Sequence, residues 1–175
     1  MLNPTTIFVT GGSRSGKSTF ARRRAESLEG RKVFVATAMP IDDEMRARIL
    51  AHKRERGGQW DTVEEPLDLV GVIERLKDRY EVIVIDCLTI WLTNVVLAWE
   101  DRLVEGGIVR LAERLRQVRG DVDILIVSNE VGMGIVPDGA LSRRFRDHAG
   151  LLNQMVAEVC DEAYLIVSGM PLRLK

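Results

Sequence analysis

The sequence predicts an α/β protein with a doubly wound, mostly parallel sheet that carries helices on both faces. Apolar runs bounded by turn residues recur along the chain, and their continuous hydrophobicity is typical of parallel strands buried on both sides. Segments with helical apolar periodicity lie between these runs, so strands and helices alternate and right-handed crossovers are expected. The expected strands are Ile7–Val9, Val33–Ala36, Val82–Ile85, Ile124–Val127 and Tyr164–Val167.

The expected helices follow from apolar stripes at helical spacing. They cover the stripe of Val70, Ile73 and Leu76, the stripe from Ile108 to Val118, and residues 138–159, and a further helix over Thr19–Leu28 is expected after the first strand and its turn. Leu88–Trp99 is apolar nearly all round, which fits either a fully buried helix or a subunit interface. The last residues, Met170–Lys175, are expected to add a small edge strand.

A glycine-rich stretch joins the first strand to the first helix and fits the pattern G-x-x-x-x-G-K-[ST]. Its glycines let the main chain curl around phosphate oxygens, and the helix N-terminus adds partial positive charge. Lys17 can reach the β- and γ-phosphates and the Ser18 hydroxyl can bind Mg²⁺. A chance glycine-rich turn is disfavoured because both flanks agree. We therefore predict a P-loop NTPase-like fold, with phosphates bound by Gly11, Gly12, Ser13, Arg14, Ser15, Gly16, Lys17 and Ser18.

Length and composition are those of one globular domain over residues 1–175. A net charge of −1 gives no electrostatic footprint for nucleic acid or an anionic membrane. The chain opens almost directly into a strand, no apolar run is long enough to span a bilayer, and a cytoplasmic protein is expected. Cys87 and Cys160 have apolar neighbours and are expected to be buried free thiols.

Asp86 ends the third expected strand, the position of a Walker B carboxylate that helps hold Mg²⁺. A strand-ending cap is the alternative for this residue, and the P-loop favours the metal-binding interpretation. Ligands of open α/β sheets gather at the carboxyl ends of strands, so the turns that leave those strands are the next candidates.

After the second strand, Ala36–Ala38 leads into a helical segment on which Met45, Arg48, Ile49 and His52 share one face. Arginines one turn on either side of His52 would keep the imidazole neutral and hold a phosphate for it to attack. On spacing alone, an incidental histidine on a solvated basic face is the better interpretation.

The loop after the fourth strand, Ser128–Pro137, carries Gly132 and Gly134, which suggest close approach of the main chain to a ligand. Glu130 in this loop is a candidate for contact with a metal or a hydroxyl group. A plain turn with spare glycines is the alternative.

With these blocks in order, the chain resembles the bifunctional adenosylcobinamide kinase/adenosylcobinamide-phosphate guanylyltransferase family of cobalamin synthesis. The resemblance rests on the P-loop, on Asp42–Met45 with Arg48-Ile49 and His52-Lys53, on Ser128–Pro137, and on Phe145–Asp147 with Gly150 and Asn153-Gln154. The P-loop is generic, whereas the blocks from Asp42 to His52 and from Asn129 to Pro137 are much more specific.

The resemblance implies two reactions with ATP and GTP as substrates and Mg²⁺ as cofactor. A hydroxyl of adenosylcobinamide takes the γ-phosphoryl group, and a histidine then accepts GMP from GTP and passes it on to give adenosylcobinamide-GDP. By matched position His52 is the guanylylated residue and Lys17 assists catalysis, with Ser18 and Asp86 at the metal. The matching nucleotide-contacting positions beyond the P-loop are Ala36, Thr37, Ala38, Lys53, Arg54, Glu55, Arg56, Glu64 and Asp86.

The sequence departs from the family pattern at two places. Ala51 precedes His52 where some relatives have a second histidine, and Asp86 stands where some relatives have glutamate. The resemblance also suggests a homo-oligomer, such as a trimer. Two other functions fit a P-loop: a kinase of another small hydroxylated substrate, with His52 a bystander, or a non-catalytic nucleotide-sensing module.

Overall fold

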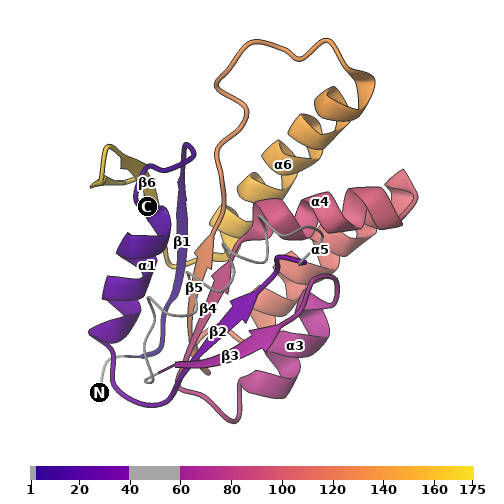
Figure 1. Ribbon diagram of the computed structural model, residues 1–175. Coiled ribbons are helices and arrows are strands. Elements are labelled where there is room, and N and C mark those ends of the chain that lie inside the picture. Colours follow the sequence, from indigo (N-terminus) through magenta and orange to yellow (C-terminus); the bar gives the residue numbers. More distant parts are fainter. Residues whose placement is uncertain (1–2, 40–59) are drawn as a thin grey trace.

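A computed structural model of the chain describes residues 3–39 and 60–175. Its centre is a seven-stranded sheet with the order β3-β2-β4-β5-β1-β6-β7 (Figure 1). Every neighbouring pair is parallel except β6 and β7. The strands are β1 (Thr6–Gly11), β2 (Lys32–Ala36), β3 (Trp60–Glu64), β4 (Val82–Asp86), β5 (Asp123–Val127), β6 (Glu162–Val167) and β7 (Met170–Arg173). The predicted doubly wound, mostly parallel sheet is confirmed.

Helices of the described residues cover both faces of this sheet (Figure 1). Among the helices of the part of the chain that the structure describes, α1 packs against one face, and α3, α4, α5 and α6 pack mainly against the other. Their bounds are α1 (Lys17–Glu26), α3 (Leu69–Leu76), α4 (Leu88–Ala98), α5 (Asp101–Gln117) and α6 (Ala140–Val159). The helices α3, α5 and α6 were expected from apolar stripes, α1 was expected after the glycine-rich loop, and α4 was one of two interpretations of Leu88–Trp99; α1 and α5 begin earlier than expected. None of these helices combines the length and the apolar character needed to cross a bilayer.

The core divides into two layers because successive strand residues point to opposite faces. On β1, Phe8 packs with the layer of α3 to α6, whereas Ile7 and Val9 pack with the layer of α1. All three side chains are buried. This burial on both sides explains the continuous apolar runs of the central strands.

The apolar segment over Leu88–Trp99 forms α4, and most of it is buried within the chain itself. Leu88, Trp91, Leu92 and Val95 are at most 2% exposed. Near the end of the helix, Leu97 is 71% exposed. The buried-helix interpretation therefore holds for most of α4, and only its end offers apolar surface.

One strand of the sheet, β3, was absent from the predicted set. It pairs in parallel with β2 and forms the edge of the sheet. Its sequence, Trp60–Glu64, mixes apolar and polar residues, and only Trp60 is buried. A half-exposed edge strand lacks the continuous apolar run by which the central strands were found.

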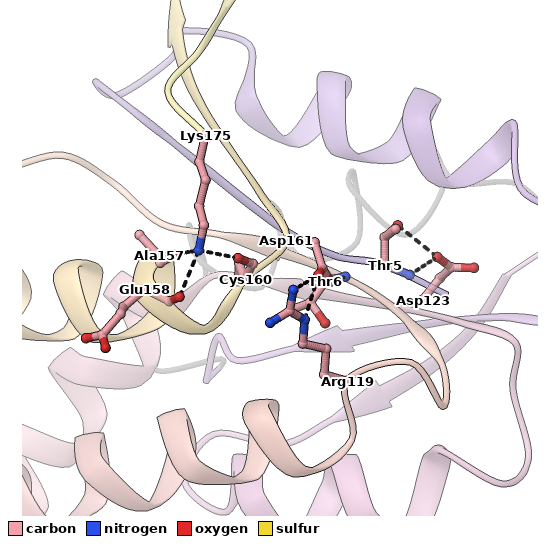
Figure 2. Close-up of polar contacts among 9 residues, drawn as sticks. All are labelled: Thr5, Thr6, Arg119, Asp123, Ala157, Glu158, Cys160, Asp161 and Lys175. Atoms are coloured by element: carbon pink, nitrogen blue, oxygen red, sulfur yellow. Dashed lines mark hydrogen bonds and ion pairs between the residues drawn. The ribbon is translucent and has the colours of Figure 1, made fainter. Parts of the chain in front are cut away.

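Polar contacts tie together the edge of the sheet at which β1, β5 and β6 begin (Figure 2). The carboxylate of Asp123 accepts hydrogen bonds from the main-chain N–H and the hydroxyl of Thr5. Asp161 accepts the N–H of Thr6 and pairs with the guanidinium of Arg119. These bonds fix the amino-terminal ends of the three strands. The functional site lies at the opposite, carboxyl-terminal ends of the strands.

A lysine closes the end of α6 at the same edge (Figure 2). The Nζ of Lys175 donates to the carbonyl oxygens of Ala157, Glu158 and Cys160 at 3.3, 2.8 and 2.6 Å. The last carbonyls of a helix lack partners within the helix, and a cation placed there also complements the helix dipole. Lys175 thus anchors the segment after β7 to the body of the chain.

Candidate nucleotide-binding site

The glycine-rich loop lies at the carboxyl end of the central strand β1. The main chain leaves β1 at Gly11 and enters α1 at Lys17, with Gly16 as the residue before the helix at a φ of 102°. The Nζ of Lys17 donates to the carbonyl oxygen of Gly12 at 2.5 Å, across the loop. A cavity of about 240 Å³ is lined by Arg14–Thr19. The loop thus has the geometry of a phosphate cradle, with the N-terminus of a ten-residue helix behind it.

Two neighbouring segments brace this loop from either side (Figure 1). The N–H of Gly169, in the turn between β6 and β7, donates to the carbonyl oxygen of Ser15 at 2.8 Å. The N–H of Glu130, in the connection from β5 to α6, donates to the carbonyl oxygen of Gly11 at 3.0 Å. Sequence reasoning missed Gly169, for which the only signal was a glycine two residues after an apolar strand.

The predicted residues outside the loop line up at the same edge of the sheet. Ala36 at the end of β2 is in register with Glu64 on one side and with Asp86 on the other. The three residues therefore form one row across β3, β2 and β4. Asp86 is half-buried and Glu64 is exposed, so both carboxylates lie at the surface of the site.

The pKa of Lys17 is set by two opposing effects, its burial and the acidic groups near it. Its side chain is only 6% exposed. Burial lowers the pKa of Lys17 below the ordinary value of 10.5, and the nearby Cys87 and Asp86 partly offset this shift. The charge of Asp86 thus acts on Lys17 from the end of β4.

Thr37 was predicted to contact the nucleotide, and its side chain is fully buried. Its hydroxyl donates to the carbonyl oxygen of Cys87 at 2.8 Å and accepts the N–H of Cys87 at 2.9 Å. The carbonyl oxygen of Thr37 accepts a hydrogen bond from Asn94 at 2.9 Å. The Thr37 side chain thus holds the residue next to Asp86, and Thr37 as a whole is buried.

A second buried network surrounds the end of β5. The Ser128 hydroxyl donates to Asn153 Oδ1 at 2.7 Å, and Asn153 Nδ2 donates to the carbonyl oxygen of Asn129 at 3.2 Å. The N–H of Asn129 donates to Thr89 Oγ1 at 2.7 Å. These contacts join α4, β5 and α6 behind Glu130, and they fix where the loop after β5 starts. Sequence reasoning noted Asn129 and Asn153 only as matching positions.

The structure places Ala36, Glu64 and Asp86 at the end of the sheet that also carries the P-loop, with β5 between β4 and β1 and with β3 at the far side of the sheet. The other predicted site residues, His52, Lys53, Arg54, Glu55 and Arg56, lie outside the described residues, as does the block that begins at Asp42. Cys87 and Cys160 are buried free thiols, as expected. Burial is the main cause that raises their pKa values, to about 11 and about 12.

A phosphate-binding loop after a central parallel strand, with a carboxylate at the end of a nearby strand, defines a P-loop nucleotide-binding protein. Solved structures with the same fold support this class. The RadB recombinase matches 93% of this chain and 74% of its own, with a TM-score of 0.53 and 16% sequence identity. The type III secretion ATPase EscN from enteropathogenic E. coli matches 94% of this chain and 43% of its own, with a TM-score of 0.59 and 11% identity. At these identities the likeness concerns the fold alone.

Sequence comparison identifies the family. The model of the cobinamide kinase / cobinamide phosphate guanyltransferase family matches residues 7–174, and the chain belongs to this family. The bifunctional adenosylcobalamin biosynthesis protein CobP of Pseudomonas aeruginosa is 41% identical over 167 residues, 95% of each chain. The corresponding CobU proteins of Escherichia coli and Salmonella typhimurium are each 38% identical, over 97% of this chain and 99% of theirs. The resemblance inferred from the motifs is therefore confirmed.

Proposed function

We propose that this chain phosphorylates adenosylcobinamide with ATP or GTP and then transfers GMP from GTP to the product, giving adenosylcobinamide-GDP. One observation carries this proposal: the family match spans nearly the whole chain and includes an intact P-loop whose Lys17 crosses the phosphate cradle. A kinase and nucleotidyltransferase of this kind is expected in the cytoplasm. The near-zero net charge gives no reason to expect a nucleic acid partner.

In the first reaction the triphosphate lies in the cradle of Gly11–Ser18. The main-chain N–H groups of the loop and the ammonium of Lys17 stabilise the charge that develops as the γ-phosphoryl group is transferred. Burial strengthens the effect of this ammonium because less water screens it. Lys17 is thus a catalytic residue of this step.

The metal requirement of this step fits the residues at the site. Ser18 offers a hydroxyl at the start of α1 and Asp86 a carboxylate at the end of β4, and Mg²⁺ prefers hard oxygen ligands of this kind. A magnesium ion held there would supply positive charge that neutralises the phosphates. Ser18 and Asp86 are the residues we assign to it.

In the second reaction we assign the attack on the α-phosphorus of GTP to His52. A neutral imidazole nitrogen would form the bond to phosphorus while pyrophosphate leaves with the bonding electrons. Lys53, Arg54, Glu55 and Arg56 follow the nucleophile and would contact the nucleotide. The row of Glu64, Ala36 and Asp86 supports this assignment, because two carboxylates flank Ala36, the last residue of the strand that precedes His52 in the sequence. Glu64 and Asp86 would share contacts to guanine, ribose and metal, with Ala36–Ala38 contributing main chain.

Covalent labelling tests the proposal. Protein incubated with Mg²⁺ and GTP labelled at the α-phosphate should carry an acid-labile, base-stable label after denaturation, and the His52→Ala variant should not. Phosphoryl transfer from ATP to adenosylcobinamide is measured in parallel. Turnover of ATP on another hydroxylated substrate without covalent label would instead support a simple kinase. Nucleotide binding without turnover or label would support a sensor.

We also propose a homo-oligomer, such as a trimer. Exposed apolar side chains gather at the end of α4, in the loop after β5 and at the start of α6: Leu97, Met133, Ile135, Val136 and Leu141 are 52–96% exposed. Apolar surface in this amount favours a protein–protein contact. Light scattering tests it, and a monomeric mass would contradict it.

A further inference from the structure

A second cavity, of about 400 Å³, lies beside the P-loop. It is lined by Gly12–Ser15 of the loop, by Leu165–Ser168 at the end of β6, and by Glu130 and Met133 from the connection between β5 and α6. In Figure 1 the top of the P-loop lies between the turn after β6 and this connection. The cavity thus opens next to the phosphate cradle and shares residues with it.

Glu130 is attached to the start of the P-loop by its own main chain. Its N–H donates to the carbonyl oxygen of Gly11, and the ammonium of Lys17 binds the carbonyl oxygen of the next residue, Gly12. Lys17 is the residue that reaches the β- and γ-phosphates in P-loops. Glu130 is therefore held at the end of the cradle where the γ-phosphate is expected.

The carboxylate of Glu130 is oriented by the loop that carries it. Its Oε1 accepts the N–H of Gly132 at 2.6 Å. A Cβ atom on residue 132 would lie 2.9 Å from this oxygen, so glycine lets the turn close on the carboxylate. Among the residues that the structure describes, Oε2 has no hydrogen-bond partner. One oxygen fixes the side chain, and the other is available to a substrate.

We propose that this cavity receives the hydroxyl-bearing arm of the phosphoryl acceptor and that Glu130 takes the proton of that hydroxyl. The inference rests on the kinase reaction proposed above. The hydroxyl oxygen forms the new bond to the γ-phosphorus, and the bond from this phosphorus to the bridging oxygen breaks. The nucleoside diphosphate leaves with the electron pair. The proton passes to the carboxylate of Glu130 and then to solvent.

The walls of the cavity match a short aliphatic arm that ends in a hydroxyl group. Met133, Leu165 and Val167 form an apolar side, whereas Ser13 and Glu130 are polar. The volume is at the lower end of the range of about 300–1,000 Å³ typical of small-ligand sites. It accommodates an arm, while the bulk of a macrocyclic acceptor stays outside.

Glu130→Gln tests the proposal, because the amide oxygen can still accept the N–H of Gly132 but cannot take a proton. We expect phosphoryl transfer to adenosylcobinamide to fall by about 10²–10⁴-fold in kcat, the range for loss of a general base. The KM for ATP and the extent of GMP labelling should stay within about twofold, since neither uses this carboxylate. Glu130→Asp should retain part of the rate, because it keeps a carboxylate. Glu105→Gln, which removes an exposed carboxylate on α5, is the matched control.

Measuring both phosphoryl transfer and GMP labelling distinguishes the possible roles of Glu130. Unchanged phosphoryl transfer in Glu130→Gln would overturn the role of Glu130, and an equal loss of both activities would show a structural role instead. If the wild-type chain takes GMP but does not phosphorylate adenosylcobinamide, the proposed kinase function fails and the inference fails with it. A wild-type kinase with an unaffected Glu130→Gln variant overturns the inference alone.

Discussion

The Nζ of Lys17 and the carbonyl oxygen of Gly12 are joined by a 2.5 Å hydrogen bond that crosses the P-loop. The lysine is nearly fully buried, and burial lowers its pKa from the ordinary 10.5. Between the lowered pKa of Lys17 in the folded chain and its pKa of 10.5 in the unfolded chain, the unfolded chain binds more protons than the folded chain. The contribution of Lys17 to stability therefore rises with pH in this window, and at neutral pH its burial is a cost.

We therefore expect Lys17→Met to raise the Tm measured without nucleotide and to abolish the Tm increase caused by Mg²⁺ and ATP. Phosphoryl transfer should fall by about 10²–10³-fold, as for loss of one group that stabilises transition-state charge. Thermal denaturation over a pH series from 7 toward 10.5 checks the prediction, and the wild-type disadvantage should shrink as the pH approaches 10.5. A variant that keeps its nucleotide-induced Tm increase would contradict it.

Gly11 and Gly12 are adjacent, but their surroundings differ. A Cβ atom on Gly11 would collide with the carbonyl oxygen of Ile166, and the residue has a φ of +146°. Nothing lies within 4 Å of a Cβ atom on Gly12. Gly11→Ala should lower the free energy of unfolding by about 2 kcal/mol or more, and Gly12→Ala by about 0.5 kcal/mol or less. Urea denaturation compares the two, and equal losses would count against this account.

Much of the fold could be predicted because its signals are local. The runs that became β1, β4 and β5 are buried on both faces, and the P-loop pattern specifies its own strand, turn and helix. Asp86 followed from its place at a strand end. In contrast, β3 exists because β2 pairs with it, and its sequence of mixed polarity carries no such signal.

The contacts around Asp86 could not be predicted for a different reason. Thr37 and Cys87 are fifty residues apart, and Asn94 is fifty-seven residues from Thr37, about two turns into α4. No spacing rule links them, because they meet only when β2 and β4 pair. A polar asparagine inside the apolar α4 was the one available signal, since a buried side chain of this type needs partners.

Both cysteines should resist thiol reagents in the folded chain. Cys87 is 7% exposed and Cys160 is fully buried, and their pKa values are raised to about 11 and about 12. At pH 8 about one-tenth of an ordinary thiol with pKa near 9 is ionised, against about one-thousandth at pKa 11. Titration with a disulfide reagent should detect no thiol before denaturation and two afterwards. An Asp78→Cys variant, at an exposed position after α3, should react at once.

The same shifts have a consequence at alkaline pH. The pKa values are higher in the folded chain, so between about pH 9 and their raised values the unfolded chain has lost the thiol protons that the folded chain keeps. The free energy of unfolding should therefore fall across this window. A Cys160→Ala variant should show a smaller fall, measured as urea midpoints at pH 8 and pH 10. Rapid reaction of either native thiol at pH 8 would contradict the burial on which both predictions depend.

The hydroxyl of Thr37 is the contact that we expect to position Asp86. It both donates to and accepts from the main chain of Cys87, and the N–H of Thr37 donates to the carbonyl oxygen of Asp86 at 3.4 Å. Thr37→Val keeps the shape but leaves two buried groups of Cys87 without this partner, at a cost of about 1–3 kcal/mol. Thr37→Ser keeps the hydroxyl and should stay close to wild type.

Stability alone would not separate a positioning role from a structural one, so the readout is the Mg²⁺ dependence of phosphoryl transfer. Loss of a group that orients a metal ligand weakens metal binding by about 10–100-fold, and the Mg²⁺ concentration for half-maximal rate should rise accordingly in Thr37→Val. Thr93→Val is the matched control, because the exposed Thr93 hydroxyl bonds only the carbonyl of Thr89 within its own helix. If Thr37→Val is destabilised but keeps the wild-type Mg²⁺ dependence, Thr37 supports the fold without directing Asp86. If Thr37→Val needs more Mg²⁺ and Thr37→Ser behaves like the wild type, the buried hydroxyl of Thr37 orients the metal-binding carboxylate of Asp86.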